Sequence, residues 1–121
     1  MENAYKEVIR IHLRHLLDSG LTQREIAAKL EFENANNISM LMSKDNSFTL
    51  AAKKLPLLQK ACDLSSTDAF KLVRSLMDSS SGGGKLLSFD TKTFDWLTSI
   101  TLSAFAENAI AFNLKGGMPR A

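Results

Sequence analysis

The sequence predicts an all-α protein, and three observations support this. Apolar residues recur every three or four positions through most of the chain. Residues that favour strands are few, and capping patterns led by Ser or Thr precede the apolar runs. With 121 residues, 45% of them hydrophobic, the chain is long enough for one compact core and at most a small second element.

The first two helices have clear expected boundaries. Apolar residues at helical spacing predict a helix over residues 3–17, and Gly20 stands where a C-terminal cap is expected. Thr22 and Glu25 then have the spacing of a capping box, in which the hydroxyl accepts the Glu25 amide hydrogen and the carboxylate accepts the Thr22 amide hydrogen. A second helix is therefore expected over residues 23–30.

Three more short helices complete the predicted first domain. Polar residues 31–34 interrupt the apolar pattern, which resumes in a third helix over about residues 35–43. A fourth helix is expected over residues 50–63, where Pro56 should either begin the regular part or kink it. A capping pattern at Ser65 begins the fifth helix.

A Ser/Gly-rich segment separates this domain from the C-terminal part of the chain. Residues 79–87 have the composition of a flexible linker, and Asp90 can cap a helix over about residues 91–114. We therefore expect a five-helix domain over residues 1–78, the linker, and a C-terminal helical element over residues 88–121.

The C-terminal helix is apolar nearly all round, which predicts that another surface covers it. Because the linker separates it from its own domain, oligomerisation is the expected use of this element. The residues assigned to this role are Phe94, Trp96, Ile100, Phe105 and Phe112. A membrane span is not expected, because Glu107 and Asn108 lie in the middle of the apolar stretch.

Cysteine content and charge bound the location and the chemistry. A lone cysteine, Cys62, excludes an internal disulfide and a Cys-rich zinc site, and the N-terminus lacks the apolar core of a signal peptide. A cytoplasmic protein is therefore expected. His12 and His15 have no further ligand nearby, so no metal is expected, and no cofactor or enzymatic activity is expected either.

The net charge is only +2, and residues 1–44 hold six basic and six acidic side chains. Any DNA affinity would therefore depend on the placement of charges.

Two consecutive segments resemble a known DNA-binding motif. The run LTQREIAAKL at residues 21–30, followed by NANNISML at residues 34–41, resembles the lambda-repressor-like (Xre-type) helix-turn-helix family. Residues 55–64 are similar to the fourth helix of that family, so the resemblance covers about residues 5–77. Two features differ. Glu31 stands where a glycine commonly follows the second helix at a positive φ, and the stretch from there to Ile38 is one residue longer.

The resemblance implies that the third helix reads DNA in the major groove. With Ile38 and Leu41 turned inward, the start of this helix presents small and polar residues to base edges. The expected base contacts are Asn36 first, with Ala35, Asn37 and Met40 beside it. Asparagine can form two hydrogen bonds with adenine, whereas alanine and methionine can contact a thymine methyl. The alternative is that the Asn-rich stretch only forms a turn and a cap.

Residues around this helix are expected to contact the DNA backbone. Free backbone amides at the start of the second helix favour a phosphate, and the resemblance makes Gln23 a backbone clamp. Asn34 is expected either to contact a phosphate or to act only as a cap. The expected phosphate contacts are Thr22, Gln23, Asn34, Lys44 and Asn46. Lys53 and Lys54 are expected to be solvated surface lysines.

Together these features predict a sequence-specific DNA-binding transcriptional regulator of prokaryotic or phage type. It would bind a palindromic operator in double-stranded DNA as a homodimer, because one short helix reads only a few base pairs. It would act by occupying that site, and the position of the operator decides whether it is a repressor, the expected case, or an activator. The alternative is a protein-interaction module, such as an antitoxin or a phage-encoded inhibitor that captures a partner protein through its C-terminal helix. The weak net charge and the acidic residues Glu31 and Glu33 favour this second interpretation.

Overall fold

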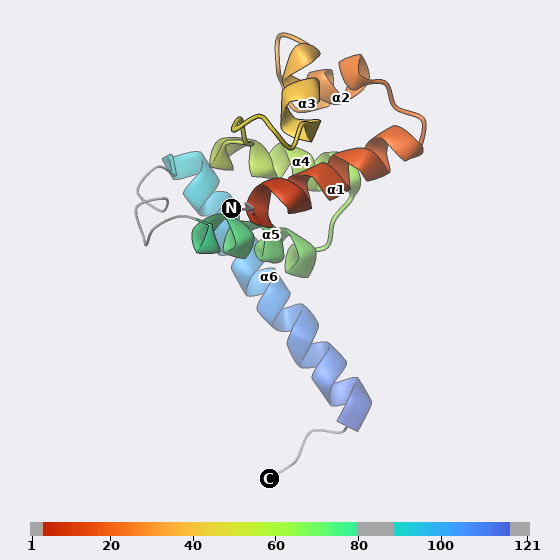
Figure 1. Cartoon of the computed structure of the whole chain (residues 1–121). Helices are drawn as coiled ribbons and strands as arrows, with labels where there is room; N and C mark the ends of the chain where they lie inside the picture. Colours follow the sequence, from red (N-terminus) through yellow and green to blue (C-terminus); the bar gives the residue numbers. More distant parts are fainter. Residues whose placement is uncertain (1–3, 80–88, 117–121) are drawn as a thin grey trace.

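Six α-helices and one short 3-10 helix make up the described part of the chain (Figure 1). The computed structural model describes residues 4–79 and 89–116, with side chains described as far as residue 109. The elements are α1 (Ala4–Asp18), α2 (Gln23–Lys29), α3 (Asn36–Met42), the 3-10 helix η1 (Ala52–Lys54), α4 (Leu55–Cys62), α5 (Ser66–Asp78) and α6 (Thr91–Gly116). No strand occurs among these residues, which confirms the all-α prediction.

Local hydrogen bonds begin α2 and α5 where the capping patterns predicted. The Thr22 hydroxyl accepts the Glu25 amide hydrogen at 3.1 Å, and the Glu25 carboxylate accepts the Thr22 amide hydrogen at 2.8 Å. The Ser65 hydroxyl accepts the Asp68 amide hydrogen at 3.1 Å. Each cap satisfies an amide that the first turn of a helix leaves without an internal partner, so the position of the cap determines the position of the helix start.

The fourth helix begins later than the sequence predicted. Residues 50–51 are not helical, η1 follows them, and the regular helix α4 starts at Leu55 with Pro56 in its first turn. Proline has no amide hydrogen to donate, and its fixed φ suits a helix start. Pro56 therefore begins the regular part of α4 and does not kink it.

The core lies between α1 and the helices that follow it. α1 packs against α2, α3 and α5, and α4 packs against α2 and α5. The largest fully buried side chains are Tyr5, Ile9, Leu13, Ile26, Leu30, Ile38, Leu41, Leu50, Leu55, Leu58, Leu72 and Val73. The Tyr5 hydroxyl donates to the Leu50 carbonyl at 2.8 Å, so the polar end of this buried ring is satisfied and joins α1 to the segment before η1.

The first part of α6 packs against α5 and adds to the same core. Ile100 is only 4% exposed and belongs to the apolar cluster that α1–α5 form. Trp96 is half-buried, and its Nε1 donates to Gln59 Oε1 of α4 at 2.7 Å. The prediction that Trp96 and Ile100 lie on a surface without cover inside the chain is therefore wrong, because α4 and α5 cover them.

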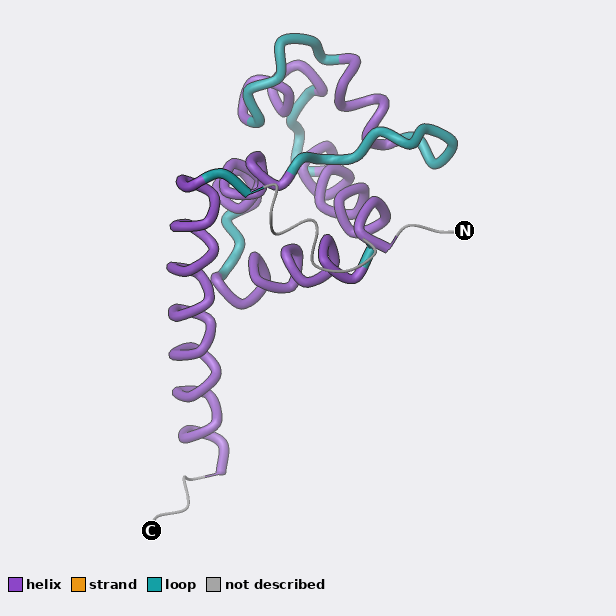
Figure 2. The backbone as a smooth tube through the Cα atoms, turned by 90° about the vertical axis from the view of Figure 1, so that its left-hand side faces the viewer, coloured by secondary structure: helices purple, strands orange, loops and turns teal. Residues whose placement is uncertain are grey.

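The opposite side of α6 is open. Phe94, Leu102 and Phe105 are 47%, 67% and 77% exposed, and we call these three residues the outer face of α6. The far end of α6 extends away from the other helices and lies opposite α2 and α3 (Figures 1 and 2). Phe112 belongs to α6, but its side chain lies outside the described residues, as do residues 80–87 of the predicted linker.

Among the described helices, none combines the length and the apolar character that crossing a bilayer needs.

Candidate nucleic-acid interface

α2 and α3 form a two-helix unit with an apolar interior, called here the α2–α3 unit. In this interior α2 packs against α3 through Ile26 and its C-cap residue Leu30. They lie with Ile38 and Leu41 of α3, and all four side chains are fully buried. Ala27 is 3% exposed, as expected for a small residue that lets two helices approach closely. Its carbonyl accepts the Phe32 amide hydrogen at 2.8 Å, which closes the end of α2.

The turn after α2 contains a strained residue. Glu31 has a φ of 59°, in the left-handed region that favours glycine. The positive φ expected at this position is therefore present, although a glutamate occupies it. The Glu31 amide donates to the Ala28 carbonyl at 3.1 Å, so the residue forms part of the C-terminal cap of α2.

Asn34 forms a turn just before α3, whose N-cap residue is Ala35. Its side-chain oxygen accepts the Asn36 amide hydrogen at 2.8 Å, and its backbone carbonyl accepts the Asn37 amide hydrogen at 3.0 Å. These bonds satisfy two amides at the start of α3 from the turn before the helix. The oxygen is occupied within the chain, which leaves the Nδ2 hydrogens as the part of this side chain suited to a phosphate.

The side of α3 away from the core is uncharged and able to form hydrogen bonds. At 3.6 residues per turn, Asn36, Ser39 and Met40 lie opposite Ile38 and Leu41, and we call these three residues the outer face of α3. Asn36 and Ser39 are exposed, and Met40 is half-buried. This face can donate to and accept from a base edge and can also offer an apolar methyl group.

The other predicted base-contact residues lie beside this face. Asn37 is half-buried on the flank of α3, and Ala35 precedes the helix in a helical backbone conformation. Ser39 is not among the base contacts that the sequence predicts, because those lie mainly at the start of the helix. Its spacing of three residues after Asn36 was the available signal, because residues three apart lie on one helical face.

A hydrogen bond joins the start of α2 to the outer face of α3. The Ser39 hydroxyl donates to Gln23 Oε1 at 2.8 Å. This contact leaves the Gln23 Nε2 hydrogens as donors for an outside acceptor such as a phosphate oxygen. The Thr22 hydroxyl, by contrast, is already used in the capping box.

The loop after α3 contains the last two predicted phosphate contacts. Lys44 is exposed. Asn46 is half-buried, and its side-chain oxygen accepts the Phe48 amide hydrogen at 2.8 Å, so it also shapes the loop. Of the two, Lys44 has the more accessible side chain.

Lys54 does not behave as the solvated lysine that the sequence suggested. Its ammonium donates to the carbonyls of Leu30 at 2.9 Å and Glu31 at 3.1 Å, and it lies 4.6 Å from the centroid of the Phe32 ring. It therefore caps the C-terminal end of α2. Lys53 is exposed.

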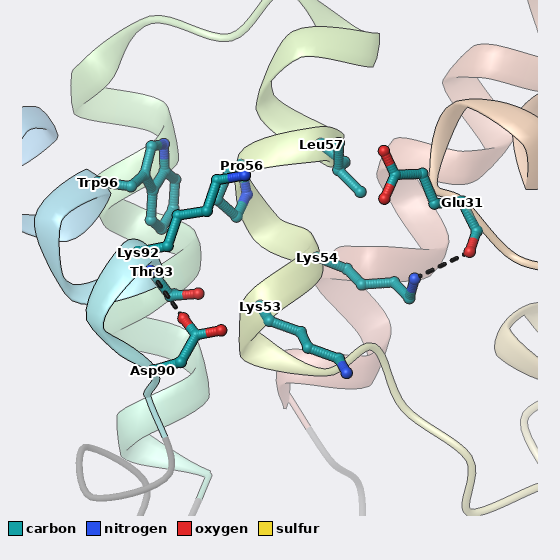
Figure 3. Close-up of a pocket in the computed structure, with 9 residues that line it drawn as sticks. All are labelled: Glu31, Lys53, Lys54, Pro56, Leu57, Asp90, Lys92, Thr93 and Trp96. Carbon is teal, nitrogen blue, oxygen red and sulfur yellow. Dashed lines mark hydrogen bonds between the residues drawn. The ribbon is translucent and has the colours of Figure 1, made fainter.

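Lys53 and Lys54 line a cleft of about 500 Å³ between the turn after α2, the start of α4 and the start of α6 (Figure 3). Pro56 and Trp96 form an apolar wall of this cleft, and Lys92 extends beside them. Acidic and basic side chains both reach the cleft, so its charge does not favour one kind of small ligand.

The exposed charges of the α2–α3 unit and its loop carry no positive excess. The exposed basic residues are Arg24, Lys29 and Lys44, and the exposed acidic residues are Glu25, Glu31, Glu33 and Asp45. Attraction of a polyanion by net charge is therefore weak here, and specific contacts would have to supply the affinity.

No family model, no curated protein and no solved structure matches this chain. The candidate interface therefore rests on the contacts of α2 and α3.

Reactive chemistry is weakly developed in the described residues. Burial raises the pKa of Cys62 to about 11, so its thiol stays protonated and poorly nucleophilic near neutral pH. Burial lowers the pKa of His12, which is half-buried on α1. Within residues 4–79 and 89–116, no cluster of three or more His, Cys, Asp or Glu side chains could hold a metal ion.

Proposed function

We propose that this protein is a sequence-specific, DNA-binding transcriptional regulator of the lambda-repressor-like (Xre-type) helix-turn-helix family that works in the cytoplasm without catalysis. The observation that carries the proposal is the α2–α3 unit. Its apolar side chains are buried between two short helices, and the side of α3 away from them is uncharged and able to form hydrogen bonds. A helix of this kind fits the major groove, where each base pair has its own pattern of donors and acceptors.

In the proposed complex, α3 lies in the major groove and reads bases through its outer face. Asn36, exposed in the first turn, can donate from Nδ2 to adenine N7 and accept from adenine N6. Met40, one turn later, can contact a thymine methyl group. Ser39 can either contact a base or hold Gln23 in place through its hydrogen bond.

Backbone contacts would set the register of α3 in the groove. Gln23 can donate from Nε2 to a phosphate on one side of the groove, and exposed Lys44 can pair with a phosphate on the other. Asn34 and Asn46 have their oxygens occupied inside the chain, so only their Nδ2 groups would take part. Contacts of this kind position the protein but carry no sequence information.

We propose a homodimer as the active form, with the outer face of α6 between the two copies. Phe94, Leu102 and Phe105 replace Trp96 and Ile100 in this role, because Trp96 is half-buried and Ile100 is buried inside the chain, whereas the other three lie on the exposed side of α6. A two-fold axis along α6 would leave both α2–α3 units at the same end of the assembly, since they lie opposite the far end of α6 (Figure 1). That arrangement suits a palindromic operator.

Selection from random duplex DNA by the full-length protein tests the proposal. We expect one enriched sequence with two-fold symmetry and half-sites about one helical turn, or a multiple of one turn, apart. Binding to it should weaken as salt rises. The proposal is wrong if the folded protein is not retained on DNA even at low salt.

A protein-interaction module is the second candidate function. The observation that favours it is the outer face of α6, where Leu102 and Phe105 are more than half exposed. The exposed charges of the α2–α3 unit and its loop, which have no positive excess, agree with it. Under this proposal the full-length chain would bind a protein partner through α6. Loss of partner binding in Phe105→Ala, with no DNA retention by the intact protein, would support it.

A further inference from the structure

The C-terminal end of α3 is bonded to a buried lysine from α1. The Lys6 side chain lies inside the molecule, and the residue is only 7% exposed. Its ammonium donates to the carbonyls of Met40 at 3.1 Å and Leu41 at 3.2 Å, both in the last turn of α3. It also donates to the carbonyl of Phe48 at 2.7 Å, in the loop that follows α3.

A second cation from α1 continues this arrangement. Arg10 Nε donates to the carbonyl of Met42 at 2.8 Å, and the same guanidinium forms an ion pair with Glu7. Three successive carbonyls of α3, at residues 40–42, are thus bonded to positive side chains one helical turn apart on α1.

These contacts stabilise the C-terminal end of α3. The last carbonyls of a helix have no internal partner and carry the negative end of its dipole. α3 has only seven residues, which is too short to be stable by itself, so its direction depends on what its ends and its apolar side touch. A buried ammonium is unfavourable unless its hydration is replaced, and the three carbonyls replace it. This also restricts where those carbonyls can lie.

We infer that Lys6 and Arg10 are positioning residues for base recognition, an inference that rests on the proposed DNA-binding function. They set the tilt and rotation of α3, and so the place of Asn36 and Met40 in the groove. Because Lys6 also bonds to Phe48, one ammonium links the base-reading helix to the loop of Lys44. Neither cation is placed to neutralise a phosphate, since both are used inside the chain.

Lys6→Met and Arg10→Gln test the inference on the full-length protein. Lys6→Met keeps most of the side-chain stem and removes the cation from a buried residue. Arg10→Gln removes the guanidinium from a residue that is only half-buried. Affinity is measured for the selected duplex and for a random duplex. We expect the ratio of the two affinities to fall about tenfold, as for the loss of one base contact, with random-duplex affinity and its salt dependence unchanged. Lys44→Gln is the matched case for a phosphate contact and should lower both affinities and the salt slope.

Amide hydrogen exchange gives a second readout that does not depend on DNA. Both variants should speed exchange of the α3 amides and leave the α5 amides unchanged, whereas Lys71→Met, at an exposed residue of α5, should affect neither helix. If Lys6→Met fails to fold by circular dichroism, Arg10→Gln decides both readouts. If α3 exchange is faster in the variants but the full-length protein does not bind DNA, the proposed function is refuted. Lys6 and Arg10 would then only fix the position of α3. An unchanged affinity ratio, or unchanged α3 exchange in folded variants, would overturn the inference.

Discussion

Replacing Glu31 with glycine should stabilise the protein, although it removes a side chain. A left-handed conformation costs an L-residue roughly 1–2 kcal/mol, and Glu31 has a φ of 59°. Glycine avoids that strain but loses roughly 0.5–1 kcal/mol through the greater freedom of the unfolded chain. The Glu31 side chain is exposed, and its backbone contacts to Ala28 and Lys54 do not need it. We therefore expect the free energy of unfolding to rise by about 0.5–1 kcal/mol.

Two control variants separate the backbone effect from the loss of charge. Glu31→Ala removes the same carboxylate but keeps a Cβ at the strained position, so it should bring no gain. Glu33→Gly removes a carboxylate from an exposed residue of the same turn where φ is not positive, and should destabilise by roughly 0.5–1 kcal/mol. Urea unfolding, followed by the fluorescence of Trp96, the only tryptophan, measures the free energy of unfolding of the three variants. If Glu31→Gly is no more stable than Glu31→Ala, the positive φ stores no strain and the reasoning fails.

Three further predictions concern the interface, its core and the tail. Asn36→Ala should lower affinity for the selected duplex by about 1–3 kcal/mol and leave random-duplex affinity nearly unchanged in binding titrations. Ala27→Leu should cost about 1–3 kcal/mol of stability in thermal unfolding because it overpacks the buried contact of α2 and α3, whereas Ala28→Leu, on the exposed side, should be nearly neutral. Ile100→Ala should cost about 2–5 kcal/mol, and Phe105→Ala should leave the stability of the monomer nearly unchanged while sedimentation shows weaker self-association. A Phe105→Ala protein that self-associates like the original would exclude the outer face of α6 from the dimer contact.

Features that depend on neighbouring residues were predictable from the sequence. The capping box of Thr22 and Glu25 and the cap at Ser65 each join residues three apart, so spacing alone indicates the contact. The burial of Ile38 and Leu41 follows from helical periodicity in the same way. The outward position of Asn36 follows from those two buried residues.

Features that depend on distant residues were not predictable. Lys6 bonds to carbonyls 34, 35 and 42 residues away, and a lysine on α1 has the same appearance in the sequence whether it faces solvent or a helix end. The hydrogen bond between Trp96 and Gln59 joins residues that are 37 apart in the chain. Trp96 comes after the Ser/Gly-rich segment, and the composition of that segment predicted a separate helix and not one that packs against the core. An apolar helix shows that it needs cover, but its sequence does not say which surface supplies it.

The internal use of basic side chains explains why net charge is a poor guide to the function of this chain. Lys6, Arg10 and Lys54 bond to backbone carbonyls at the ends of α2 and α3, where they determine geometry. Cations used in this way would release no counterions on binding DNA, so they add nothing to non-specific affinity. The proposed regulator should therefore owe its discrimination to the placement of an uncharged helical face, and the same cations that leave its surface nearly neutral would keep that face in position.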